Sequence, residues 1–234
     1  MEENKMKTQI ILVICIYCFS TSLFGQKDIS GTYYNDAGMQ IKIEDNKFTY
    51  IISQSHSPIY HSDTLAECSI KRIDKNFIEI NSVPPLFSIQ RRLQVNQSFE
   101  NGISDSIKVV FLIPYDFGEL VISIYTDLAF QKLYELHYSK NNNTIMLPKT
   151  IKSFFYGFEP QLSSIITHSV EGAFYGIMRV EPLLECAIEK GQNSVEINIP
   201  TLDNSFFEKY YVKGEYVRIT HNKIEWKGDV FVKN

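Results

Sequence analysis

The sequence predicts an all-β protein, with a small N-terminal antiparallel meander or half-barrel followed by a larger β-sandwich-like lobe and few short helices. First, apolar and polar residues alternate with a period of two along much of the chain. Second, strand-like segments recur about every 8 to 12 residues between turn residues. Third, 44% of the 234 residues are hydrophobic and only 11 are glycine and 8 proline. This composition excludes disorder, collagen and coiled coil as the main architecture.

Residues 1–25 are expected to be a secretory signal peptide. A short basic region precedes an uncharged apolar run over residues 10–19, and small polar residues follow it. A membrane-spanning helix needs about 20 apolar residues, so no stable membrane span is expected after cleavage. Cleavage after Ser22 and cleavage after Gly25 both remain open. The protein is therefore expected to be exported to the periplasm, the cell surface or the medium, in a Gram-negative bacterium.

Residues 26–85 are predicted to form the meander lobe. Alternation over 39–43 and 48–52 flanks Asp45 and Asn46. This pattern predicts a β-hairpin, because successive strand side chains point to opposite faces and Asn tolerates the positive φ of a tight turn. Two further strands are expected, at 64–70 and 77–80, followed by a linker at the prolines 84–85.

Residues 86–234 are predicted to form the sandwich-like lobe. The nearly continuous apolar run at 107–113 is typical of a central strand buried on both sides. Short helices are expected near 161–167 and 204–210, and the segment 127–136 fits either a helix or a strand. The other predicted strands are 87–95, 119–125, 132–138, 144–147, 152–158, 174–180, 184–188 and 195–199.

The end of the chain resembles its first hairpin. Residues 38–50 align without gaps with residues 214–226, and the aligned Gly, Ile, Asn and Lys are identical. One interpretation is convergence, because any half-buried hairpin with an Asn turn favours such residues. Alternatively, the two hairpins belong to equivalent lobes, or they lie in one barrel closed by the two chain ends.

Two cysteines, Cys68 and Cys186, remain after the expected signal peptide is removed. The exported compartment permits a disulfide between them. The alternative is two buried free thiols, since free cysteine behaves as a small hydrophobic residue. The sequence leaves both interpretations open.

Motifs for the commonest catalytic and cofactor sites are absent from the sequence. There is no Gly-x-Ser-x-Gly elbow, phosphate-binding loop, Gly-x-Gly-x-x-Gly, His-Glu-x-x-His, paired Cys-x-x-Cys or calcium-binding loop. We therefore expect no catalytic residue, no metal and no cofactor. The net charge of −4 also argues against a nucleic-acid partner, which favours a basic protein.

A polar loop contains the main cluster of candidate acid–base groups. His56 and His61 flank a Ser-Pro-Ile-Tyr segment, and Asp63 follows. The three side chains would suit a hydrolase if they met in one cleft. They would be ordinary solvated loop residues if they point apart.

Adjacent aromatic residues are the main indication of a binding function. Neighbouring strand residues face opposite sides, so one ring of each pair is expected outside the core unless another sheet covers it. The candidate ligand-binding residues are Tyr34, Phe155, Tyr156 and Tyr211. The pair Arg91-Arg92 suits an acidic ligand, or alternatively a strand edge or a contact between lobes.

The N-terminal segment offers one resemblance. The Gly31-Thr-Tyr opening with a meander behind it is similar to lipocalin-like modules, which implies a carrier of a small apolar ligand as an alternative function. The leading expectation is an exported, non-catalytic binding or interaction protein with a protein or glycan partner of the cell envelope. A secreted hydrolase is the remaining alternative.

Overall fold

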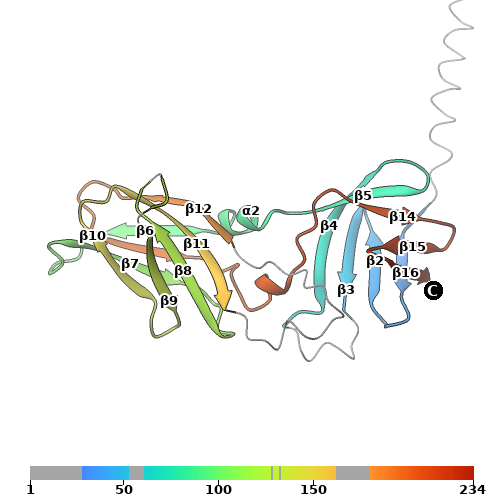
Figure 1. Ribbon diagram of the computed structural model, residues 1–234, viewed down its shortest axis with the longest axis horizontal. Coiled ribbons are helices and arrows are strands. Elements are labelled where there is room, and N and C mark those ends of the chain that lie inside the picture. The colour runs from blue at the N-terminus through green and yellow to red at the C-terminus, as the bar shows by residue number, and fades with distance from the viewer. Residues whose placement is uncertain (1–27, 53–60, 128, 132, 162–179) are drawn as a thin grey trace, which may run out of the picture.

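The computed structural model describes residues 28–52, 61–127, 129–131, 133–161 and 180–234. The regular structure in these residues is almost entirely β, which confirms the predicted all-β class. It comprises a closed eight-stranded barrel and two four-stranded sheets (Figure 1). The predicted signal peptide and the predicted helix near 161–167 lie outside the described residues, apart from Gln161.

The barrel combines five strands from the start of the chain with three from its end. All of its strand pairs are antiparallel, and β1 pairs with both β2 and β16, which closes the sheet. In chain order the strands are β1 (Gly31–Tyr34), β2 (Gln40–Glu44), β3 (Lys47–Ile51), β4 (Thr64–Arg72), β5 (Phe77–Ser82), β14 (Glu215–Ile219), β15 (Lys223–Trp226) and β16 (Asp229–Lys233).

The two similar hairpins of the sequence therefore lie in one barrel. Strands from the two ends of the described chain pair with each other and close it. Strand β14 pairs with β5, and β16 pairs with β1. The sequence-based boundary between residues 85 and 86 assigns these last strands to the second lobe, whereas the structure joins them to the barrel. Period-two alternation identifies a strand but carries no information about its partner, which explains the difference.

The predicted turn between β2 and β3 is confirmed. Asp45 and Asn46 have φ values of 47° and 62°, and Glu44 pairs with Lys47 across the hairpin. Two positive φ values in succession match the twist of the flanking strands, which is why short polar residues occupy the turn.

Aromatic side chains fill the interior of the barrel. The Trp226 ring makes edge-on contacts with Phe48 and Tyr50, at centroid distances of 5.2 and 5.1 Å, and Tyr50 also contacts Phe231 at 6.2 Å. All four side chains are at most 7% exposed. An eight-stranded barrel is just wide enough for such a packed core or for one small ligand, and here side chains occupy the space.

Residues 94–198, which lie between barrel strands β5 and β14, form the other two sheets. One sheet has the order β10-β7-β13-β6 and the other β12-β11-β8-β9. All neighbours are antiparallel except β7 and β13, which are parallel. The bounds are β6 (Gln94–Ser98), β7 (Ser106–Leu112), β8 (Glu119–Tyr125), β9 (Leu133–Tyr138), β10 (Thr144–Pro148), β11 (Ser153–Gln161), β12 (Val180–Ala187) and β13 (Ser194–Asn198).

Both sheets contribute buried side chains to one hydrophobic cluster, which is separate from that of the barrel. Phe111 of β7 contacts Tyr156 and Phe158 of β11 at centroid distances of 5.6 and 6.4 Å. The continuous apolar run at 107–113 thus forms a central strand, as predicted, although its side chains alternate between buried and partly exposed.

Two connections run between the barrel and these sheets, and the first contains a helix that the sequence did not indicate. Residues 85–90 form α2 (Pro85–Gln90) in place of the predicted linker and strand. Pro85 stands in the first turn, where its missing amide costs no hydrogen bond and its fixed φ suits a helix. Ile89 is buried while Phe87 is 60% exposed, so their spacing of two does not mark one strand face.

The second connection runs from β13 to β14 and contains a short 3-10 helix, η2 (Phe206–Glu208). It occupies the middle of the helix expected at 204–210, and all three of its residues are buried. In the described residues no helix is long and apolar enough to span a membrane.

Candidate functional site

A groove of about 690 Å³ lies where both connections pass the barrel. We call it the inter-lobe groove. Three segments form its walls: the barrel strands β4 and β5, the α2 region, and the connection before β14. Its lining residues are Thr64, Ala66, Glu67, Ser82, Val83, Pro85, Ser88, Arg91, Arg92, Pro200, Thr201, Asp203, Phe206, Lys209, Tyr210 and Tyr211.

Hydrogen bonds hold the second connection against the barrel at one wall of this groove. The Tyr210 amide donates to the Leu65 carbonyl at 2.7 Å, and the Ser82 amide donates to the Val212 carbonyl at 2.8 Å. The Tyr210 ring packs on Tyr50 at 5.6 Å. Tyr211, the next residue, lines the groove and is 40% exposed. The doublet therefore places one ring against the core and leaves the other accessible.

The charged side chains of the groove are unevenly paired. Arg91, Arg92 and Lys209 form no ion pair or side-chain hydrogen bond within the described part of the chain. The carboxylate of Glu67, in contrast, is bound by Lys47 at 2.5 Å. Asp203 accepts hydrogen bonds from the amide and hydroxyl of Ser205, at 3.0 and 2.8 Å. The groove therefore has an excess of uncompensated positive charge.

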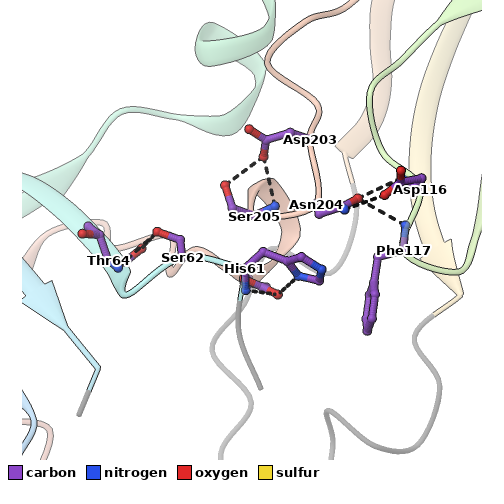
Figure 2. Close-up of polar contacts among 9 residues, drawn as sticks. His61, Ser62, Thr64, Asp116, Phe117, Asp203, Asn204 and Ser205 are labelled. Carbon is purple, nitrogen blue, oxygen red and sulfur yellow. Dashed lines mark hydrogen bonds and ion pairs between the residues drawn. The ribbon is translucent and has the colours of Figure 1, made fainter. Parts of the chain in front are cut away.

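A polar cluster beside η2 links residues just before barrel strand β4 to the second connection (Figure 2). The His61 Nδ1 lies 2.7 Å from Oε1 of Glu208, and the His61 amide donates to both carboxylate oxygens at 2.9 and 3.2 Å. The Glu208 side chain is only 6% exposed, so these contacts replace most of its hydration. Both the ring and the amide of His61, which stands just before β4, are thus bound to one carboxylate.

The same cluster extends to the loop between β7 and β8. Asn204 donates from Nδ2 to Oδ1 of Asp116 at 2.6 Å, and its Oδ1 accepts the amides of Asp116 and Phe117 at 2.8 and 3.2 Å. Lys140 donates to the other Asp116 oxygen at 2.6 Å. Hydrogen bonds from Lys140 and Asn204 hold the pKa of the Asp116 carboxyl below its usual value.

His61 also contacts the loop between β7 and β8, because its ring packs edge-on against Phe117 at 4.7 Å (Figure 2). A carboxylate that orients a histidine through Nδ1 is the arrangement of a general base. However, no Ser, Thr or Cys side chain bonds to His61 within the described segments. No group of three or more metal-ligating side chains occurs in those segments either. The observed contacts connect three segments of the fold.

The structure does not bring together the three loop candidates of the sequence analysis. His56 lies outside the described residues. Asp63 is exposed, and its carboxylate accepts a hydrogen bond from the Thr64 hydroxyl at 3.3 Å. The partner of His61 is instead Glu208, which sequence reasoning missed because 147 positions separate the two and no local motif marks either.

The four aromatic candidates are also dispersed. Tyr34 lies on β1, which β2 and β3 separate from the groove strand β4. Phe155 contacts Phe130 at 5.4 Å and pairs in register with Tyr125. Only Tyr211 lines the inter-lobe groove.

Tyr156 is a core residue and is not accessible to a ligand. It is fully buried in the cluster of the two four-stranded sheets. Burial raises its pKa far above the usual value, and its hydroxyl has no hydrogen-bond partner in the described part of the chain. The hydrophobic face of β11 explains the correction, because Phe154 and Phe158 share that face with Tyr156.

The possible disulfide is not present in the structure. Cys68 and Cys186 are buried free thiols, one in the barrel cluster and the other in the cluster of the second pair of sheets. Burial raises the pKa of each thiol to about 11. The two cysteines thus behave as small core residues, the alternative that the sequence left open.

Comparison with known proteins adds no family: no protein-family model matches the chain, and neither a curated protein nor a solved structure matches it.

Proposed function

We propose that this is an exported, non-catalytic binding protein of the cell envelope and that the inter-lobe groove is its binding site. The groove itself is the observation that carries the proposal. Its volume of about 690 Å³ lies within the range of about 300–1,000 Å³ that is typical of ligand pockets. Its walls combine an accessible tyrosine with charged and hydroxyl side chains, which suits a polar ligand such as a glycan.

The barrel interior argues against the alternative of an apolar-ligand carrier. Such a carrier requires an apolar cavity inside the barrel, whereas the rings of Phe48, Tyr50, Trp226 and Phe231 contact one another there. A ligand on the barrel axis would have to displace these side chains. Binding outside the barrel is therefore the simpler proposal.

The polar cluster favours a structural role over hydrolysis. His61 and Glu208 form a histidine–carboxylate pair, but no nucleophile among the described side chains is bonded to it. We also propose that the two four-stranded sheets form a β-sandwich, because they share one hydrophobic cluster. Export to a Gram-negative envelope is proposed from the pattern of residues 1–25.

Cell fractionation and glycan binding test this proposal. Full-length protein should be processed and recovered in the periplasmic or surface fraction, and the purified mature chain should bind envelope glycans on an array. Tyr211→Ala should abolish that binding. Tyr216→Ala is the matched control, because Tyr216 is 62% exposed but lies on β14 outside the groove. Cytoplasmic retention, absence of any glycan ligand, or equal binding by both variants would contradict the proposal.

A further inference from the structure

We infer that the inter-lobe groove binds an anionic saccharide, meaning a sugar unit that carries a phosphate, sulfate or carboxylate group. Arg91, Arg92 and Lys209 would bind the anionic group, and Tyr211 would contact the sugar. The inference rests on the proposed function, since it assigns the ligand class of the same groove.

The charge distribution is the first argument. Three cations without a partner in the described residues line one groove of a protein whose net charge is −4. Like charges close together repel one another, and an anion would relieve that repulsion. Of the two acidic side chains of the lining, Glu67 is already paired with Lys47. Asp203 keeps its negative charge, because its partner Ser205 is neutral, but one carboxylate does not balance three cations.

The chemistry of the cations is the second argument. Adjacent arginines at the end of α2 present planar guanidinium groups, which bind carboxylates and phosphates through paired hydrogen bonds. Lys209 approaches from the other connection, so the positive charges come from two segments of the groove. An anion held between them would also fix the two connections relative to each other.

The neutral lining is the third argument and indicates a sugar rather than an anion alone. Tyr211 presents an accessible ring with an apolar face and a polar tip. The hydroxyl groups of Ser88 and Thr201 line the groove and have no hydrogen-bond partner among the described residues. The Ser88 hydroxyl can exchange hydrogen bonds with sugar hydroxyls, whereas the buried Thr201 oxygen would need a small movement of the wall to do so.

Calorimetric titration of the full mature protein tests the inference. The probes are glucose 6-phosphate, glucuronate, glucose and inorganic phosphate. Binding of the two acidic sugars is expected, with weaker or undetectable binding of glucose and of inorganic phosphate. The double variant Arg91→Gln/Arg92→Gln should weaken binding of the acidic sugars by about tenfold or more. Their binding should also weaken as salt is raised.

Arg218→Gln is the control variant, because Arg218 is exposed on β14 and bonds to Glu225 outside the groove. It should leave the affinities within about twofold, and circular dichroism should show both variants folded. Equal binding of glucose and glucuronate, with no effect of the double variant, would overturn the inference while leaving a glycan-binding groove. Equal binding of inorganic phosphate and glucose 6-phosphate would overturn the saccharide assignment. Failure of the unmodified protein to bind any saccharide would instead refute the proposed function.

Discussion

His61 and Glu208 are 147 positions apart in the chain, yet both the amide and the ring of His61 contact the Glu208 carboxylate. His61 lies between the barrel strands β3 and β4, and Glu208 belongs to η2 in the connection that returns to the barrel. Phe117 packs on the same histidine from the loop between β7 and β8. Through these contacts His61 joins three distant segments beside the groove.

Glu208→Ala should lower the free energy of unfolding by about 1–3 kcal/mol, because it leaves the His61 amide without its acceptor in a partly buried position. Urea denaturation followed by fluorescence measures the change. Glu225→Ala is the control, since it removes an exposed carboxylate paired with Arg218 and should cost less than about 1 kcal/mol. Equal effects of the two variants would show that the His61–Glu208 contact has no special role.

Tyr156→Phe should leave stability unchanged or raise it by about 1 kcal/mol, because the buried Tyr156 hydroxyl has no partner among the described residues. Tyr138→Phe is the matched control. Its hydroxyl donates to the Ile113 carbonyl at 2.7 Å and accepts from the Ile113 amide at 3.1 Å, so its removal should cost about 1–2 kcal/mol. Chemical denaturation of both variants distinguishes the cases. A clear loss of stability in Tyr156→Phe would mean that the hydroxyl is satisfied after all.

Phe231→Ala should destabilise the barrel by about 3–5 kcal/mol, because it removes a fully buried ring from the strand that closes the sheet. Val232→Ala changes the next residue of β16, which is 40% exposed, and should cost less than about 1 kcal/mol. Thermal unfolding gives the comparison. Similar melting temperatures for the two variants would contradict a packed and closed barrel.

The two buried thiols should make stability depend on alkaline pH. Burial raises the pKa of Cys68 and of Cys186 to about 11, from an ordinary value of 9.0 that the unfolded chain should show. Between these values the unfolded state loses protons that the folded state keeps, so stability falls as pH rises from 9 to about 11. Below pH 9 both states keep the protons and the contribution is complete.

The variant Cys68→Ala/Cys186→Ala should therefore lose stability less steeply over this window, although its core is weaker at every pH. Urea denaturation between pH 8 and pH 11 measures both slopes. The buried tyrosines titrate in both proteins and cancel in the comparison. Parallel curves for the two proteins would refute the shifted thiols.

Local patterns explain which parts of the fold the sequence could predict. The β2–β3 hairpin depends on alternation and on two turn residues, Asp45 and Asn46, all within one short segment. The pairing of β1 with β16 depends on residues about 200 positions apart, and alternation alone does not specify it. The gap-free similarity of the two hairpins did point to a barrel closed by both ends, as one of several interpretations.

The candidate site was less accessible to sequence reasoning for the same reason. Arg91-Arg92 and Tyr211 attract attention as a charged pair and an aromatic doublet, but nothing local places them in one groove. Tyr156 belongs to an equally aromatic run and is buried, because the alternation of β11 turns it inward. Adjacent aromatic residues therefore indicate that one ring lies outside the strand's buried face without showing which ring can bind a ligand.

The closure of the barrel by β1 and β16 also constrains the order in which the protein can fold. Synthesis proceeds from the N-terminus, so β1 to β5 are made before the sheets of residues 94–198, and β16 is the last of the barrel strands to be made. Until then the first strand has one open edge, which is a site for mispairing. Contacts between such distant segments also form slowly. We therefore expect the sheets of residues 94–198 to fold before the barrel closes. A chain halted before Asp229 should lack β16, which leaves β1, near the start of the chain, with an unpaired edge.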